Sequence, residues 1–249
     1  MGLRIFAHAI TLVFSHIGFA LRISALLYLV PAVLYELVIA TVVRNPDPLL
    51  ALRIASPIFL FLAAAAALWI AVGWHRYILL DEAPGAIAPP FRGDRVLAYF
   101  GNSLLVGLIA FGIALVFFLP VGFIAAIIGR AGGTISYLVL LLPLASYFVI
   151  AVLVYRVSLI LPASAIGKPI KLSEAWAATR GSNGTFFALA IVSVLCAAGL
   201  TFPVLWITPN LGALAGFVWQ TATSWIELMV GVSIITTLYG YYVEKRALP

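Results

Sequence analysis

Charged side chains are scarce in this sequence, and their scarcity excludes a water-soluble protein. Only 14 Lys and Arg and 8 Asp and Glu occur among 249 residues, and 65% of the residues are hydrophobic. Soluble domains carry about 25% charged residues. A chain of this composition cannot cover a surface that faces water, so we expect an integral membrane protein.

The residues from which active sites and metal sites are built are equally few. The chain has one Cys, Cys196, and three His, whose spacing matches no pattern of metal ligands. The motifs Gly-x-Ser-x-Gly and His-Glu-x-x-His are missing, as is a glycine-rich phosphate loop. We therefore predict no catalytic residue, no metal, no cofactor and no enzymatic activity. The net charge of +6 suits loops beside anionic lipid and does not indicate nucleic-acid binding.

Apolar runs of about 20 residues, the length of a membrane-crossing helix, recur along the chain. They are continuous and lack the alternation of barrel strands, so helices are expected. The predicted fold is an all-α integral membrane protein with a single transmembrane domain over residues 1–249. Its six spans are expected at about 23–43, 54–73, 97–119, 135–155, 186–206 and 221–243. Pro120 and Gly122 predict a break after the third span.

Residues 1–22 come before the first span and show an amphipathic pattern. One helical face carries Arg4, His8, Thr11, Ser15 and Arg22. This pattern predicts a helix that lies in the membrane interface. A cleaved signal peptide is the alternative, because Arg4 precedes an apolar stretch.

Basic residues are distributed unequally between the two sides that six spans define. Eleven fall on the side of the termini: Arg4, Arg22, Arg76, Arg92, Arg95, Arg156, Lys168, Lys171, Arg180, Lys245 and Arg246. Three fall on the other side: Arg44, Arg53 and Arg130. Cytoplasmic loops are enriched in Lys and Arg, so both termini are expected in the cytoplasm.

Three segments share small polar residues and Gly before an outward span, about 80 to 85 residues apart: 15–18, 101–103 and 181–184. One interpretation is three successive units, each an interfacial helix followed by a helical hairpin. The other is that evenly spaced loops and ordinary helix capping produce the same spacing. In the last hairpin, Gly212 and Gly216 fit the close packing of membrane helices.

Two carboxylates, Glu36 and Glu227, are predicted inside spans at similar depth, roughly 10 Å below the periplasmic surface. Acids in a membrane are costly and face a partner or a wet cavity. They could form a proton or cation site. Alternatively, each could pair with Arg44, Arg53, Arg130 or a Tyr hydroxyl, or extend its carboxylate to the membrane interface.

Aromatic and basic residues close the second span and occupy the long loop of residues 156–184. They are candidate interfacial anchors or lipid-headgroup contacts: Trp74, His75, Arg76, Arg156, Lys168, Lys171, Trp176 and Arg180. Ser173 and Glu174 predict the start of a short helix, and its apolar residues Leu172, Trp176 and Ala177 are expected on the membrane surface.

Several of these motifs resemble a known family. Arg156, Leu161-Pro162-Ala163, Leu172 to Trp176 and Thr179-Arg180-Gly181 are similar to a signature in the membrane domain of some bacterial glycerophosphoryl diester phosphodiesterases. Trp74 to Tyr77 with Asp81 to Gly85 resembles stand-alone relatives of that domain. The phosphodiesterase domain itself is missing from this sequence, so its activity is not implied. The resemblance implies a bacterial inner-membrane protein of about six helices.

Short loops and the lack of a catalytic set favour a protein that acts by association. It would be an accessory or scaffold subunit of a membrane complex, or a lipid-organising protein, with membrane lipids and other membrane protein subunits as partners. The alternative is a small proton- or ion-coupled transporter or channel that uses Glu36 and Glu227.

Overall fold

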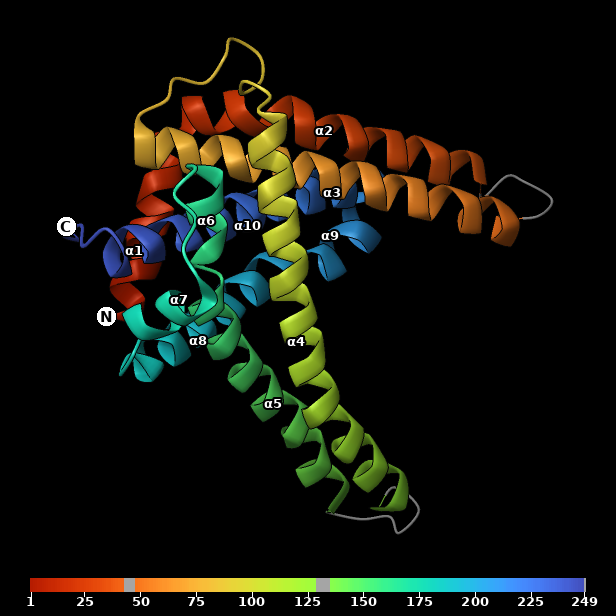
Figure 1. Cartoon of the computed structure of the whole chain (residues 1–249). Coiled ribbons are helices and arrows are strands. Elements are labelled where there is room, and N and C mark those ends of the chain that lie inside the picture. Colours follow the sequence, from red (N-terminus) through yellow and green to blue (C-terminus); the bar gives the residue numbers. More distant parts are fainter. Residues whose placement is uncertain (43–47, 129–134, 249) are drawn as a thin grey trace.

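The computed structural model describes residues 1–42, 48–128 and 135–248, and helices dominate it (Figure 1). The helices are α1 (Gly2–Ser15), α2 (Ile17–Val42), α3 (Pro48–Leu80), α4 (Gly93–Ile128), α5 (Ile135–Val157), α6 (Ile160–Ala165), α7 (Leu172–Ala178), α8 (Asn183–Thr201), α9 (Val204–Leu211) and α10 (Ala213–Tyr242). The described residues contain no strand. Six helical stretches are long and apolar enough to cross a membrane, and a shorter apolar helix precedes them. The predicted all-α membrane fold is therefore confirmed.

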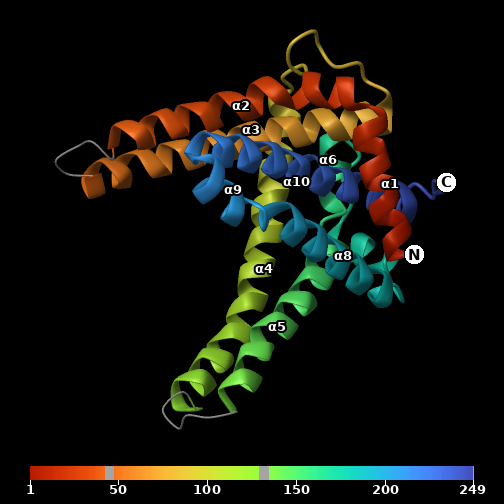
Figure 2. The same cartoon turned by 180° about the vertical axis from the view of Figure 1, so that it is seen from behind.

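The spans form three hairpins that share one end. Helix α2 packs on α3, α4 packs on α5, and the pair α8–α9 packs on α10. Both termini, the segment 81–92, and helices α1, α6 and α7 gather at one end of the molecule, which we call the hub (Figures 1 and 2). From the hub, the hairpins α2–α3 and α4–α5 run out in clearly different directions.

The buried core is concentrated at the hub. Trp74, Phe186, Ile5 and Leu238 are among its fully buried side chains, and they come from four helices. Half of the α10 span is buried, whereas only 6% of the α4 stretch Gly93–Pro120 is buried. The outer parts of the hairpins therefore present apolar side chains to the membrane.

Helix α1 is amphipathic, as the sequence predicts, but its apolar face packs on protein. Ile5, Ala9 and Val13 are fully buried, and α1 packs against α8 and α10. Arg4 and Thr11 are exposed on the opposite side. Burial against two helices removes this apolar face from lipid and makes α1 part of the core.

Two helices continue past residues that predict their ends. Helix α4 passes through Pro120, although proline removes one backbone hydrogen bond. Membrane helices tolerate such a loss because their surroundings satisfy the freed groups. Helix α3 continues past Gly73 to Leu80, so the aromatic and basic residues expected at a membrane surface lie within its last turns.

The turn between α9 and α10 depends on two glycines. Gly212 has φ +93°, a left-handed conformation that glycine adopts without strain. A Cβ atom at Gly216 would overlap the Thr208 side chain on α9. The close approach of α9 and α10 therefore requires glycine at residue 216.

The predicted threefold repeat consists of a short helix followed by a helical hairpin. The structure has the three hairpins, but not a short helix before each of them. Helices α1 and α7 precede the first and third hairpins, but residues 81–92 before the second form no helix. Residues 101–103 lie about two turns inside α4 and not at its start. A helix before every hairpin is thus not present.

Candidate functional site

Three arginines near the ends of the returning spans tie the hub together. Arg76 Nη1, near the end of α3, donates a hydrogen bond to the Ala165 carbonyl on α6 at 3.0 Å. Arg246 Nη2, after α10, donates to the Leu79 carbonyl on α3 at 2.9 Å. Arg156, in the last turn of α5, binds residues of α7 and α8. Each arginine thus connects its own hairpin to another part of the chain.

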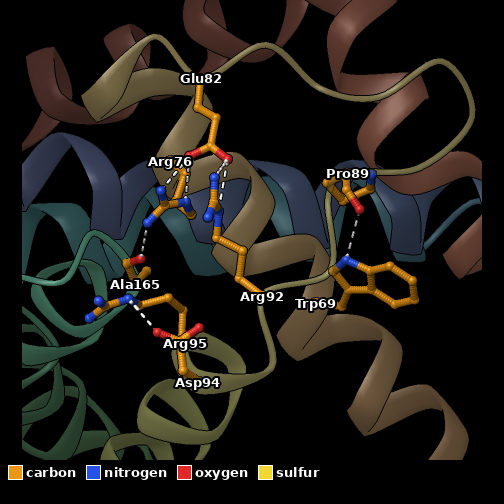
Figure 3. A network of polar contacts seen from close by, with 8 residues as sticks. All are labelled: Trp69, Arg76, Glu82, Pro89, Arg92, Asp94, Arg95 and Ala165. Carbon is orange, nitrogen blue, oxygen red and sulfur yellow. Dashed lines mark hydrogen bonds and ion pairs between the residues drawn. The ribbon is translucent and has the colours of Figure 1, made fainter.

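Glu82 bridges two of the arginines in the network that Figure 3 shows. Its Oε2 accepts a hydrogen bond from Arg76 Nε at 2.7 Å and one from Arg76 Nη2. Its Oε1 accepts from Arg92 Nε at 2.9 Å and Nη2 at 2.7 Å. The carboxylate therefore joins the end of α3 to the segment that leads into α4.

Glu82 is ionised at neutral pH. Burial alone would raise the pKa of Glu82, but hydrogen bonds from Arg92 and Arg76 and their positive charges hold it below its ordinary value of 4.5. The Arg76 side chain is 14% exposed and is engaged inside the hub. Arg76 was predicted as a headgroup contact, but its guanidinium is ion-paired with Glu82, which Arg92 also shares.

Trp74 and His75 are core residues, which corrects their prediction as interfacial anchors. Both are fully buried, because α3 continues past them and packs against α10. Trp74 Nε1 donates to Ser233 Oγ at 2.9 Å. Neither side chain can reach a lipid headgroup.

The contacts of His75 assign its tautomer. The Thr236 hydroxyl donates to the Val232 carbonyl at 2.8 Å, so its oxygen must accept from His75 Nδ1–H, also at 2.8 Å. His75 Nε2 then accepts from the Tyr99 hydroxyl at 3.2 Å. This neutral network satisfies both ring nitrogens, so His75 joins α3, α4 and α10 as a structural residue.

Arg156 is buried without a carboxylate among the residues that the structure describes. Only 6% of the residue is exposed. Its three hydrogen bonds go to neutral oxygens: Nε to Thr179 Oγ1 at 3.0 Å, Nη1 to Asn183 Oδ1 at 3.2 Å, and Nη2 to the Trp176 carbonyl at 3.1 Å. The guanidinium carbon lies 3.7 Å from the centroid of the Trp176 ring. A cation held only by neutral groups is unusual, because buried charges are normally paired.

The remaining candidate anchors lie on the outside of the hub. Lys168, Lys171 and Arg180 are exposed, and Trp176 is 41% exposed. Helix α7 begins at Leu172, within one residue of the predicted start, and Glu174 Oε2 accepts a hydrogen bond from the Lys171 backbone at 2.9 Å. Leu172 and Ala177 are exposed beside Trp176, so α7 presents apolar and basic side chains together.

The two membrane acids lie on different helices. Glu36 is exposed on α2, and the side chains of Arg44, Arg53 and Arg130, its suggested partners, lie outside the described residues. Glu227 is half-buried on α10 and accepts a hydrogen bond from Thr201 Oγ1 at 3.2 Å. Within the described residues no hydrogen bond or ion pair joins Glu36 to Glu227. Glu227 lines a cavity of about 580 Å³ together with Tyr155, Ser193 and Thr201.

The histidines of the N-terminal region line a smaller cavity at the hub, of about 230 Å³. His8 and His16 face it from α1 and the junction with α2, and Arg246 faces it from the C-terminal segment. Burial lowers the pKa of His8. The described part of the chain contains no group of three His, Cys, Asp or Glu residues that could hold a metal ion.

Two larger apolar grooves lie on either side of the middle of α3. One, of about 980 Å³, lies among α2, α3 and α10, and the other, of about 910 Å³, among α2, α3 and α4. A run of five alanines, residues 63–67, contributes to both grooves. Alanines 63–65 are exposed, so the backbone of α3 is accessible at this level.

Several residues of these sites were not predicted from the sequence. The most informative are Glu82 and Arg92, Thr179 and Asn183, Tyr99 and Thr236, and the alanine run. Glu82 follows Arg76 by six residues, and this local spacing of opposite charges was the one available signal. In the sequence, Asn183 stands out only as part of the segment 181–184, and its contact with Arg156 spans 27 residues.

Comparison of the chain with protein-family models, curated proteins and solved structures finds no match. The resemblance to the membrane domain of bacterial glycerophosphoryl diester phosphodiesterases therefore stays a prediction.

Proposed function

We propose that this protein is a non-enzymatic, multi-pass membrane protein that acts by association, as an accessory or scaffold subunit. The observation that carries the proposal is the alanine run 63–67, which contributes to the lining of two apolar grooves. The partner would place transmembrane helices in these grooves. Membrane helices associate through close packing at small residues, and alanine permits this approach.

The composition of the α3 surface favours a partner helix over lipid alone. Away from the grooves the outward surfaces carry large side chains, such as Leu108 and Phe111 on α4, each more than half exposed. Alanines 63–65 instead present small side chains at the surface of α3, where they contribute to the lining of the grooves. Helix association in lipid has no hydrophobic driving force and depends on such complementary packing. Lipid bound in the same grooves would make the protein lipid-organising instead.

The proposed location is the bacterial inner membrane, with the hub and both termini in the cytoplasm. The hub collects the exposed bases Lys168, Lys171 and Arg180 and both chain ends. A cytoplasmic excess of Lys and Arg orients such proteins. Reporter fusions at each terminus test this orientation.

Purification from native membranes in mild detergent tests the association. We expect a stoichiometric membrane protein to co-elute with the wild-type chain. Ala65→Leu, which fills the groove beside α2 and α4, should reduce the co-eluting protein. Ala222→Leu is the matched control, because Ala222 is exposed on α10 and is not among the residues that line either groove. Equal recovery with both variants would contradict a partner in the groove.

A proton- or ion-coupled transporter or channel is the second candidate, favoured by the polar groups around Glu227. The cavity there brings a carboxylate and four hydroxyl-bearing side chains together in an otherwise apolar region. Transport would require flux by the wild-type protein in vesicles and its loss in Glu227→Gln or Glu36→Gln at unchanged expression. Absence of flux in wild-type vesicles would contradict this candidate.

A further inference from the structure

The surroundings of Arg156 carry an excess of positive charge. Arg180 is exposed and directly follows Thr179, whose hydroxyl accepts a hydrogen bond from Arg156 Nε, so a second positive charge lies near this site. Helix α8, which begins at Asn183, adds the partial positive charge of its N-terminus, and its N-cap Ser182 makes no side-chain capping hydrogen bond. The C-terminal end of α5 offsets part of this charge.

Among the described residues, no acidic side chain pairs with Arg156 to balance these charges. Glu174 is the one carboxylate of α7, and its side chain is hydrogen-bonded to the Lys171 backbone at the start of that helix. Arg76, at the equivalent end of the first hairpin, has Glu82 as its counter-ion. Arg156 has no such counter-ion among the described residues. Like Arg76, it is largely buried and its guanidinium donates three hydrogen bonds.

Arg156 also has donors to spare. A guanidinium carries five N–H groups, and three of those of Arg156 are used by Thr179, Asn183 and Trp176. Within the described part of the chain, one N–H on each terminal nitrogen has no hydrogen-bond partner. Two such groups on a planar fork match the oxygens of a phosphate.

We propose that Arg156 and Arg180, with Trp176 beside them, bind the phosphate of an anionic phospholipid headgroup. The buried arginine would supply fixed donors, and the exposed arginine a second positive charge. Trp176 and Leu172 on α7 would lie among the glycerol and upper acyl groups, where tryptophan is favoured. The exposed apolar side chains of α7 favour a lipid over a free phosphate ion.

This site is separate from the α3 grooves and goes beyond the proposed association. A partner subunit could fill the grooves while the headgroup site is empty, and a lipid could occupy the headgroup site while the grooves are empty. The test below therefore does not depend on finding a protein partner.

Native mass spectrometry of the full chain in detergent tests the site with phosphatidylglycerol and phosphatidylcholine of the same acyl chains. The wild-type protein should retain one phosphatidylglycerol in preference to phosphatidylcholine. Arg180→Gln should weaken this retention about fivefold, the effect expected of one interfacial base. Arg156→Gln should abolish it. Arg22→Gln removes an exposed base from α2 and should retain the lipid as the wild type does.

Thermal unfolding with added inorganic phosphate distinguishes a lipid from a free ion. Stabilisation by phosphatidylglycerol and not by inorganic phosphate supports the lipid site. If inorganic phosphate stabilised the protein as much as phosphatidylglycerol does, the assignment to lipid would be overturned. Equal lipid retention by wild type, Arg180→Gln and Arg22→Gln would overturn the site itself, and because Arg180 is exposed this result does not depend on how Arg156→Gln folds.

Discussion

The Arg156 guanidinium lies 3.7 Å from the centroid of the Trp176 ring and also donates a hydrogen bond to the Trp176 carbonyl at 3.1 Å. One arginine at the end of α5 thus holds both the side chain and the backbone of α7. No acidic residue takes part in this contact among the described residues.

Trp176→Ala should destabilise the hub, because it removes the ring that covers Arg156. The expected loss in the free energy of unfolding is about 1 to 2 kcal/mol, the size of a partly desolvated cation–π contact. Thermal unfolding in detergent measures it. Trp206→Ala serves as the control, since Trp206 is 62% exposed on α9. An equal effect of both changes would argue against a stabilising contact.

Glu82→Gln should destabilise the protein at neutral pH by on the order of 1–2 kcal/mol, after allowance for solvent screening. Because folding lowers the pKa of Glu82, its contribution is fully present above the ordinary value of 4.5 and is lost as pH falls below it toward the folded pKa. Wild-type stability should therefore decline more steeply than that of Glu82→Gln below this pH. Parallel stability profiles of the two proteins would rule out the ionised bridge.

Tyr99→Phe should cost about 1 to 2 kcal/mol, because it removes the donor to buried His75 Nε2. Tyr35→Phe is the matched control, since Tyr35 is 41% exposed on α2. Chemical unfolding in mixed detergent can compare the two. If Tyr99→Phe were as stable as the control, a stabilising hydrogen bond between Tyr99 and His75 would be contradicted.

Gly216→Ala should separate α9 from α10, because the added Cβ would overlap Thr208. Overpacking of this kind costs roughly 1–3 kcal/mol. Gly199→Ala on α8 is the control, because its Cβ would meet no atom within 4 Å and alanine favours a helix. A lower unfolding temperature for Gly216→Ala alone is expected. Identical temperatures would show that α9 and α10 do not pack closely.

The helices of this fold could be predicted because apolar runs of sufficient length must cross the membrane as helices. The core residues could not be predicted from this property, since side chains that face lipid and side chains that face the core are both apolar. Trp74 and His75 therefore matched the pattern of a surface anchor, although contacts with α10 bury them. The apolar face of α1 presented the same ambiguity.

The candidate site was predictable only where its contacts are local. Glu174 and the start of α7 follow from capping within one turn. The Arg156 contact with Asn183 and the Trp74 contact with Ser233 join residues 27 and 159 apart, and no pattern in the sequence pairs them. From its residue type and its position at the end of a span, Arg156 was predicted to lie at the membrane interface. Only the structure shows that it is buried among neutral hydrogen-bond acceptors.

Site-specific photo-crosslinking in native membranes tests most directly whether the protein acts by association. A photoreactive residue at position 65, in the groove beside α2 and α4, should form an adduct with one defined membrane protein. The same residue at position 222 on α10 should not. Adducts with lipid alone at position 65, or the same protein adducts at both positions, would contradict a partner helix in the α3 groove.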